Sequence, residues 1–318
     1  LLQELPDGII IGVTGTRGKC TTTELLAHML RENGMRVHLG GNIRGVANLP
    51  LLEEINDGDY LVLELDSWQL QGFGDMKISP QIAVFTSFMD DHMNYYDNDR
   101  EHYFNDKANI YRFHNEYDIL LASKDAKQEI LKRDKKARVH VPDAITLETS
   151  LIGEHNQIAA QLAYEACSQC GLDDNGIRAA IKTFKAVHGR LEDLGLYNGV
   201  RVSNDNNATP PDATIKAIEA ITKTYNLSPI VITGGTDKGL PLTALEKVLQ
   251  EKTKAVIYLS GTGTDRLTLS KEYEYPTMST CVSQAFKCAK KGDVIIFSPA
   301  FASFSKYFNN EYERNDAF

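Results

Sequence analysis

Residues 12–23 read GVTGTRGKCTTT and join an apolar run, Ile9–Val13, to a segment with apolar residues at helical spacing, Lys19–Asn33. Glycines at such a junction let successive backbone N–H groups face an anion, and the amino end of the helix adds partial positive charge. Lys19 suits the β- and γ-phosphates of a nucleotide. The strict pattern would have glycine at Val13. We interpret the stretch as a phosphate loop; the alternative is a glycine-rich turn with a surface lysine.

The rest of the first half alternates short apolar runs with helical patterns, which favours a mainly parallel sheet covered by helices. Gly34 is a natural stop for the first helix. Further strands are predicted at Tyr60–Leu65, Ile82–Phe85 and Tyr117–Ala122, and a helix at Asn156–Gly171.

The second half begins near Ala186 with a hairpin signal, Asn198-Gly199, between the runs Leu194–Tyr197 and Val200–Ser203. Helices are predicted at Asp212–Tyr225, Leu242–Glu251 and Val282–Ala289, and strands at Ile230–Thr233, Ala255–Leu259 and Val294–Phe297. The sequence therefore predicts two α/β domains. Residues 1–186 form a phosphate-loop domain with a mainly parallel sheet, and residues 187–318 form a smaller Rossmann-like domain.

Composition narrows the classes of function. The 318 residues are 42% hydrophobic and carry a net charge of −9, which suits a globular protein and disfavours a nucleic-acid partner. No apolar stretch approaches the roughly 20 residues that cross a bilayer, so no membrane insertion is expected. Five dispersed cysteines fit a reducing compartment. We expect a cytoplasmic monomer.

A series of short motifs follows the loop in the order found in the Mur ligases, and the chain resembles this family over nearly its whole length. The motifs are Gly41-Asn42-Ile43, residues 63–70 (LELDSWQL), Asp90-Asp91-His92-Met93, Asp106-Lys107-Ala108, Gly153-Glu154-His155-Asn156, Gly189-Arg190-Leu191-Glu192, Asn204-Asp205, Ala208-Thr209, residues 234–238 (GGTDK) and Ser298-Pro299-Ala300. Each motif alone is weak, but their common order is specific.

The resemblance implies a ligase that activates a carboxylate by phosphoryl transfer from ATP and joins the acyl phosphate to an amino acid. It is strongest to the members that add D-glutamate to UDP-N-acetylmuramoyl-L-alanine in peptidoglycan precursor synthesis. By this resemblance the first domain binds ATP and the second binds the amino acid. The implied ATP contacts are Gly15, Thr16, Gly18, Lys19, Cys20, Thr21, Asn156, Arg190, Asn204 and Asp205. The implied catalytic residues are Lys19, Glu64, His92, Lys107 and Arg190.

The resemblance also implies two Mg²⁺ ions, with Cys20, Glu64, His92 and Lys107 as metal-binding positions and Lys107 carbamylated. Cys20 stands where the family has a hydroxyl ligand, and a neutral thiol is a poor partner for a hard cation. Three outcomes are open: water takes the place of that ligand, Thr21 supplies the hydroxyl oxygen, or the site binds metal more weakly. If these residues do not bind metal, Glu64 is a solvated glutamate at a strand end, His92 is a structural histidine and Lys107 is a lysine on a helix surface.

For the acyl and amino-acid substrates, the implied contacts are Asn42, Ser67, His92, Thr209, Lys238, Ser303 and Phe304. Lys238 suits a carboxylate of D-glutamate, Thr209 and Ser303 suit hydrogen bonds to it, and Phe304 suits packing on the side chain. Lys238 can instead be a solvated loop lysine, and residues 204–207 (NDNN) can simply form a turn.

Two other functions fit the same residues. One is another Mur or folylpolyglutamate-type ligase, and the other is an ATP-binding module without ligase turnover. The D-glutamate-adding ligases hold the UDP group in an N-terminal domain, whereas the phosphate loop here starts at Gly12. We therefore expect the 318 residues to be part of a longer enzyme and, by themselves, to bind ATP with little ligase activity.

Overall fold

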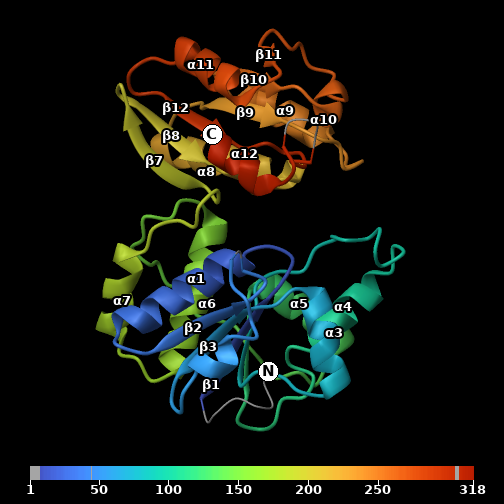
Figure 1. Ribbon diagram of the computed structural model, residues 1–318, viewed down its shortest axis with the longest axis vertical. Helices are drawn as coiled ribbons and strands as arrows, with labels where there is room; N and C mark the ends of the chain where they lie inside the picture. Colours follow the sequence, from blue (N-terminus) through green and yellow to red (C-terminus); the bar gives the residue numbers. More distant parts are fainter. Residues whose placement is uncertain (1–7, 44, 305–307) are drawn as a thin grey trace. The chain divides into compact units, whose positions relative to one another are not determined.

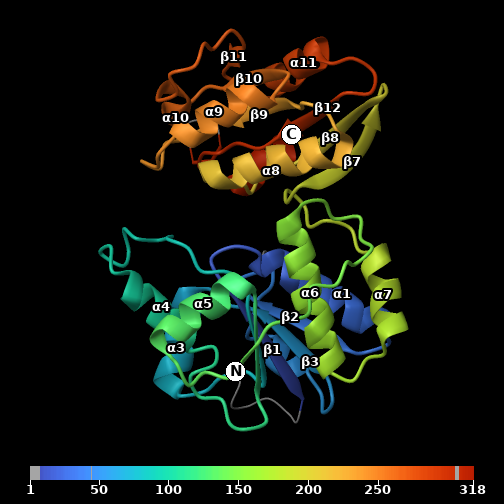
Figure 2. The same ribbon diagram turned by 180° about the vertical axis from the view of Figure 1, so that it is seen from behind.

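The computed structural model describes residues 8–43, 45–304 and 308–318, and the chain divides into two compact units (Figures 1 and 2). Unit 1 comprises Leu1–Ser150 and His155–Phe184, and unit 2 comprises Leu151–Glu154 and Lys185–Phe318. Each unit has its own sheet and its own core.

Unit 1 is built on a sheet in which the six described strands are all parallel, in the order β2-β3-β1-β4-β5-β6. The strands are β1 (Ile9–Thr14), β2 (Val37–Gly41), β3 (Tyr60–Glu64), β4 (Ile82–Phe85), β5 (Ile119–Ala122) and β6 (Val139–His140). β1 lies between two neighbouring strands, and helices cover the faces of the sheet, so Ile11 and Val13 are fully buried.

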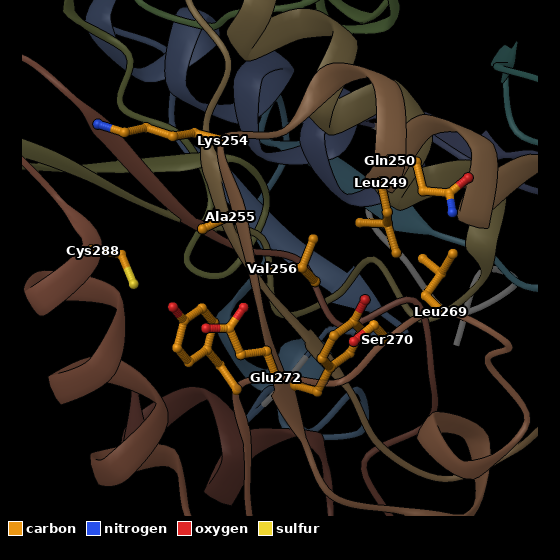
Figure 3. A pocket seen from close by; sticks show the side chains of 11 residues that line it. Leu249, Gln250, Lys254, Ala255, Val256, Leu269, Ser270, Glu272 and Cys288 are labelled. Carbon is orange, nitrogen blue, oxygen red and sulfur yellow. The ribbon is translucent and has the colours of Figure 1, made fainter.

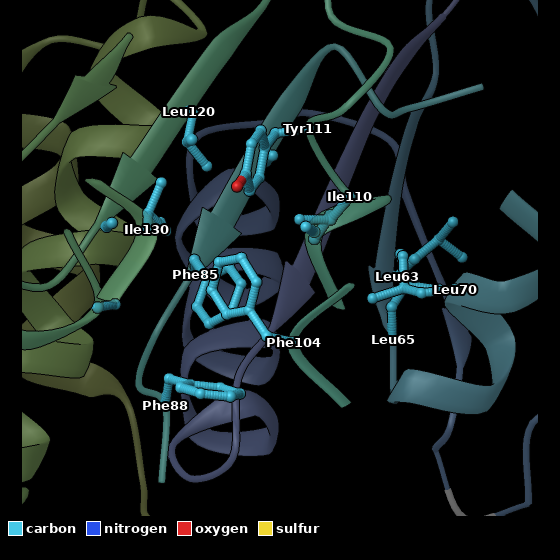
Figure 4. Packing of buried hydrophobic residues seen from close by; sticks show 14 of the residues in the cluster. Leu63, Leu65, Leu70, Phe85, Phe88, Phe104, Ile110, Tyr111, Leu120 and Ile130 are labelled. Carbon is cyan, nitrogen blue, oxygen red and sulfur yellow. The ribbon is translucent and has the colours of Figure 1, made fainter. Parts of the chain in front are cut away.

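Helices cover both faces of this sheet. One side carries α1 (Lys19–Glu32), α6 (Glu154–Gln169) and α7 (Asp174–Thr183), and the other carries α3 (Ser67–Met76), α4 (Arg100–Ala108) and α5 (Lys124–Arg133) (Figures 1 and 2). The short α2 (Leu51–Glu54) precedes β3 in the chain. Under α3, α4 and α5, the rings of Phe85, Phe88 and Phe104 gather in the core (Figure 4).

Unit 2 has a mixed sheet in the order β11-β10-β9-β12-β8-β7, in which β7 is antiparallel to β8. Its strands are β7 (Glu192–Tyr197), β8 (Val200–Asn204), β9 (Ile230–Gly234), β10 (Ala255–Leu259), β11 (Glu274–Tyr275) and β12 (Val294–Phe297). Its helices are α8 (Pro211–Tyr225), α9 (Thr243–Lys252), α10 (Thr262–Asp265), α11 (Met278–Cys288) and α12 (Glu311–Ala317). α8 and α9 share one core cluster with the sheet, and α11 packs in a second cluster.

The structure confirms the predicted fold class, including the hairpin at Asn198-Gly199. Several element ends differ from the prediction for local reasons. The strand predicted from Tyr117 begins at Ile119, because Asn115 and Asp118 close a turn around the exposed Tyr117. α11 begins at Met278, before the predicted Val282, because the Thr277 side chain caps it. Within the described residues, no helix is long and apolar enough to cross a membrane.

Candidate active site

The glycine-rich stretch forms a loop between β1 and α1, anchored to the end of β4. The Thr16 N–H donates to the Ser87 carbonyl at 2.8 Å, and the Arg17 N–H donates to Ser87 Oγ at 2.8 Å. The Thr86 hydroxyl donates to the carbonyl of Thr14 at 3.0 Å. At Gly15, where φ is 144°, a Cβ would lie 2.1 Å from Thr86 Oγ1. Only glycine allows this close approach of loop and strand.

The amino end of α1 faces this loop. Its N-cap is Gly18 in the left-handed conformation, with φ of 85° and no capping side chain. The first N–H groups of a helix carry partial positive charge, and a side-chain cap would partly neutralise it. The local structure therefore suits an anion such as a nucleotide phosphate.

Two lysines from distant parts of unit 1 meet at one backbone oxygen of the loop. Lys19 Nζ donates to the Gly15 carbonyl at 3.1 Å, and Lys107 Nζ on α4 donates to the same oxygen at 3.0 Å. Lys107 is 2% exposed. Burial, followed by repulsion from Lys19, holds the pKa of Lys107 well below its usual range. Burial beside Lys19 thus favours the neutral amine of Lys107.

Glu64 ends β3 beside the loop, and it pairs in register with Val13 on one side and Gly41 on the other. The Asn42 N–H donates to the Glu64 carbonyl at 2.8 Å, which places Asn42 at the same edge. The Glu64 side chain is buried, and its Oε2 has no hydrogen-bond partner among the described residues. A buried carboxylate oxygen without a partner fits a role as a ligand for a hard cation.

The predicted metal-binding positions do not form a complete protein cage. In the part of the chain that the structure describes, no three His, Cys, Asp or Glu residues gather as a metal site. Glu64 offers the oxygen that Mg²⁺ prefers, whereas the half-buried thiol of Cys20 in the first turn of α1 does not. Mg²⁺ characteristically keeps waters and substrate phosphates as ligands, so one or two carboxylates suffice. The residues fit such a partly open site.

His92 follows β4 in the left-handed conformation, with φ of 56°. Its ring lies 4.6 Å from the ring of Trp68 and 6.3 Å from that of Tyr103, measured between centroids. Burial lowers the pKa of His92, the nearby Asp91 opposes the shift, and Lys107 and Lys19 add to it. The neutral imidazole that this favours is the form that binds metal.

Ser67, which the sequence predicts as a substrate contact, is buried in the first turn of α3.

In unit 2, the predicted residues follow the carboxyl ends of parallel strands, which lie at one edge of the sheet. Lys238, after β9, donates from Nζ to Thr209 Oγ1 at 2.9 Å. The bridge between Thr236 and Ala302 brings the segment of Ser303 beside that of Lys238. Ser303 is buried and the following Phe304 is 62% exposed. The structure thus brings the predicted amino-acid contacts of this unit together.

Asp205, predicted to bind ATP, is buried after β8 with both carboxylate oxygens engaged. Oδ1 accepts from the Leu191 N–H at 3.0 Å and Oδ2 accepts from Ser298 Oγ at 2.9 Å. Burial raises the pKa of Asp205 to about 7, against the lowering effect of these hydrogen bonds and of Arg190. Arg190 Nε is itself buried without a hydrogen-bond partner among the described residues. Asn204 donates to Asn315 Oδ1 at 2.9 Å. Asn156 is buried at the start of α6.

Some supporting residues escaped the sequence analysis. Thr86 and Ser87 hold the loop, and their position directly after a predicted strand was the available signal. Tyr103 bonds Thr16 Oγ1 at 3.3 Å and lies under Lys107 Nζ, 5.0 Å from its ring centroid. Arg314 on α12 is buried and donates to the carbonyls of Asn206 and Phe301.

A cavity of about 570 Å³ lies elsewhere in unit 2, between the end of α9, the start of β10 and residues 269–273 (Figure 3). Its lining includes Lys254, Tyr258, Glu272 and Cys288 but none of the predicted site residues. It plays no part in the sites described above.

Comparisons with known proteins identify the family. Residues 13–144 match the family model described as the Mur ligase middle domain. A UDP-N-acetylmuramoylalanine--D-glutamate ligase of Roseiflexus sp. (strain RS-1) is 33% identical, over 98% of this chain and 75% of the relative. A ligase of the same name from Borreliella afzelii (strain PKo) is 30% identical, over 96% of this chain and 72% of the relative.

Solved structures share the fold. The MurF ligase of Thermotoga maritima in complex with ADP has a TM-score of 0.74 and 18% identity, over 92% of this chain and 77% of that chain. A bifunctional folylpolyglutamate synthase/dihydrofolate synthase with Mn, AMPPNP and L-glutamate bound has a TM-score of 0.70 and 18% identity, over 94% of this chain and 89% of that chain.

Proposed function

Because the chain belongs to the Mur ligase family, we propose that it acts as the ATP-dependent ligase that adds D-glutamate to UDP-N-acetylmuramoyl-L-alanine. The relatives that carry this name support the choice of substrates. The structural observation that carries the proposal is the convergence of Lys19 and Lys107 on the Gly15 carbonyl, beside an uncapped helix end and the unpartnered oxygen of Glu64.

The loop of unit 1 receives the phosphates of ATP in this proposal. The N–H groups at the start of α1 and the ammonium of Lys19 neutralise the phosphate oxygens. Glu64 and His92 would hold Mg²⁺ ions, which would screen the charge between the phosphates and the carboxylate. Cys20 supplies no oxygen, so water or Thr21 would take its ligand position, or the chain would bind Mg²⁺ more weakly.

The proposed reaction begins when a carboxylate oxygen of UDP-N-acetylmuramoyl-L-alanine attacks the γ-phosphorus of ATP and ADP leaves. The amino nitrogen of D-glutamate then attacks the acyl carbon and loses a proton, and phosphate departs with one oxygen of the original carboxylate. The chain contributes mainly by positioning the reactants and neutralising charge. Arg190 is proposed to stabilise the transferred phosphoryl group.

The surroundings of Lys107 support the proposal that it is carbamylated. Carbamate forms when a neutral amine attacks carbon dioxide, and burial beside Lys19 favours the neutral amine. The product would place an anionic carbamate next to the ammonium of Lys19. We propose that this carbamate helps to position the second Mg²⁺ ion, as the family resemblance implies.

The amino acid is proposed to bind unit 2 through Lys238 and Thr209, which already contact each other. The ammonium of Lys238 pairs with one carboxylate of D-glutamate, and Thr209 and Ser303 donate hydrogen bonds to the carboxylates. Phe304 is exposed and packs on the methylene groups of the side chain. Asn204, Asp205 and Asn156 are proposed to support the nucleoside part of ATP.

The test is phosphate release by the full-length protein with ATP, Mg²⁺ and UDP-N-acetylmuramoyl-L-alanine across a panel of D- and L-amino acids. Release that depends on D-glutamate supports the proposal. Phosphate release with another amino acid would support a ligase with a different amino-acid substrate. ATP binding without phosphate release, whichever amino acid is added, would favour an ATP-binding module without ligase activity.

Two variants with matched controls refine this test. Lys19→Met should abolish ATP binding, whereas Lys124→Met, an exposed lysine at the start of α5, should not change it. Lys238→Met should raise KM for D-glutamate and leave ATP binding intact, whereas Lys223→Met on the exposed side of α8 should change neither. Equal effects of a variant and its control contradict the assigned role.

A further inference from the structure

An aromatic cluster lies on the surface of unit 1 beside the proposed reaction site. The Trp68 ring is 4.6 Å from the His92 ring and 5.3 Å from the Tyr95 ring, both in edge-on geometry. Trp68 is 38% exposed and Tyr95 is 51% exposed. Large aromatic side chains left open to solvent at a functional site are characteristic of ligand contact.

The cluster is continuous with the charged centre of the site. From Trp68 the next ring is His92, followed by Tyr103 at 6.3 Å from His92. Lys107 Nζ lies 5.0 Å from the Tyr103 ring and donates to the Gly15 carbonyl. A ligand group that contacts Trp68 therefore lies close to any carboxylate that reacts beside His92 and Lys107.

Trp68 is held by the structure around it. It occupies the first turn of α3, where Asp66 and Gln69 form a capping box with bonds of 2.8 and 3.2 Å. Gln71, one turn further, donates to buried Asp106 at 2.8 Å. These bonds hold the backbone of the turn that carries Trp68, and the ring itself packs against His92 and Tyr95. An aromatic ring packed in this way has little side-chain entropy to lose when a ligand contacts it.

We infer that Trp68, flanked by Tyr95, contacts the methyl group of the L-alanine residue of the acyl substrate and selects alanine over glycine at that position. The inference rests on the proposed function. In that reaction the alanine carboxylate is the nucleophile, and the methyl group lies only two bonds from the carboxyl carbon. It is the apolar group nearest to the reacting atoms, and the exposed indole is an apolar surface at that distance from His92.

The test compares two acyl substrates, UDP-N-acetylmuramoyl-L-alanine and its glycine analogue, in wild type, Trp68→Ala and Trp68→Phe. One methyl group in an apolar contact is worth about 10-fold or more in kcat/KM. Wild type should prefer alanine by about that factor. In Trp68→Ala the preference should fall toward one, while Trp68→Phe should keep most of it. KM for ATP should stay unchanged.

The control variant is Tyr117→Ala, which removes an aromatic ring that is 84% exposed on the same unit. It should leave the preference for alanine unchanged. If Trp68→Ala slows both acyl substrates by the same factor, Trp68 only supports His92 and the inference is wrong. It is also wrong if wild type uses both substrates equally, although the proposed function then stands. Wild type inactive with the alanine substrate overturns both.

A binding measurement covers the case in which Trp68→Ala does not fold. Isothermal titration calorimetry on the full-length wild-type protein compares the two acyl substrates directly. The glycine analogue should bind about 10-fold more weakly than UDP-N-acetylmuramoyl-L-alanine. Equal affinities for the two compounds would contradict the inference.

Discussion

Replacing Gly15 by alanine tests the phosphate loop with a single methyl group. A Cβ at this position would lie 2.1 Å from Thr86 Oγ1 and 2.8 Å from Ser87 N. The second atom belongs to the backbone, so the clash cannot be relieved by rotating a side chain. The loop and the end of β4 must therefore move apart.

The size of the effect follows from two contributions. A non-glycine residue at φ of 144° is strained by about 1–3 kcal/mol, and overpacking adds about 1–3 kcal/mol. We expect Gly15→Ala to lower the free energy of unfolding by about 2–6 kcal/mol. Because the loop moves, ATP affinity should fall at least about 10-fold, which corresponds to 1.4 kcal/mol.

Gly34→Ala is the matched control. Gly34 has φ of 81° and lies after α1, but a Cβ there would have no atom within 4 Å. An alanine there is strained by about 1–2 kcal/mol because of its φ, but it clashes with no atom. Urea unfolding gives both stabilities, and isothermal titration calorimetry gives ATP affinity, which Gly34→Ala should not change. The reasoning is refuted if Gly15→Ala folds and binds ATP as wild type does, or if both variants lose the same stability.

Three further predictions concern single side chains. Asp205 has a pKa raised to about 7, so its contribution to stability is present at low pH and is lost as pH rises through about 7. Relative to wild type, Asp205→Asn should therefore be stabilised more at pH 8 than at pH 5. Thermal unfolding measures both differences, and equal differences at the two pH values would contradict the prediction. Cys20→Ser adds a hydroxyl oxygen at the start of α1, so it should lower the Mg²⁺ concentration needed for half-maximal ATP binding; an unchanged or higher requirement would show that this position does not contact the ion. Lys107 should give a carbamate ¹³C signal with ¹³C-bicarbonate, and the signal should disappear in Lys107→Gln but persist in Lys124→Gln.

Much of the fold could be predicted because apolar runs bounded by polar residues mark buried strands. Ile82–Phe85, Ala255–Leu259 and Val294–Phe297 were predicted to the residue. Helices α3, α4 and α5 were not predicted. Their starts depend on side-chain caps by Asp66, Asp99 and Ser123, and their apolar faces are short.

The surroundings of the site residues were harder to predict than the identity of those residues. The motif order identified Lys107, but its burial against a carbonyl 92 residues earlier depends on how α4 packs. The unpartnered oxygen of Glu64 and the engaged oxygens of Asp205 likewise depend on neighbours from other strands. These long-range contacts leave no local pattern, so the residue roles in this site stay predictions.

The central claim is that a carboxylate is activated by phosphoryl transfer, and isotope transfer tests it most directly. UDP-N-acetylmuramoyl-L-alanine labelled with ¹⁸O in its carboxylate is incubated with the full-length protein, ATP, Mg²⁺ and D-glutamate. We predict that the released phosphate carries one ¹⁸O atom and that the product gains one glutamate residue. Phosphate released without ¹⁸O, while the glutamate product still forms, would contradict the acyl-phosphate route.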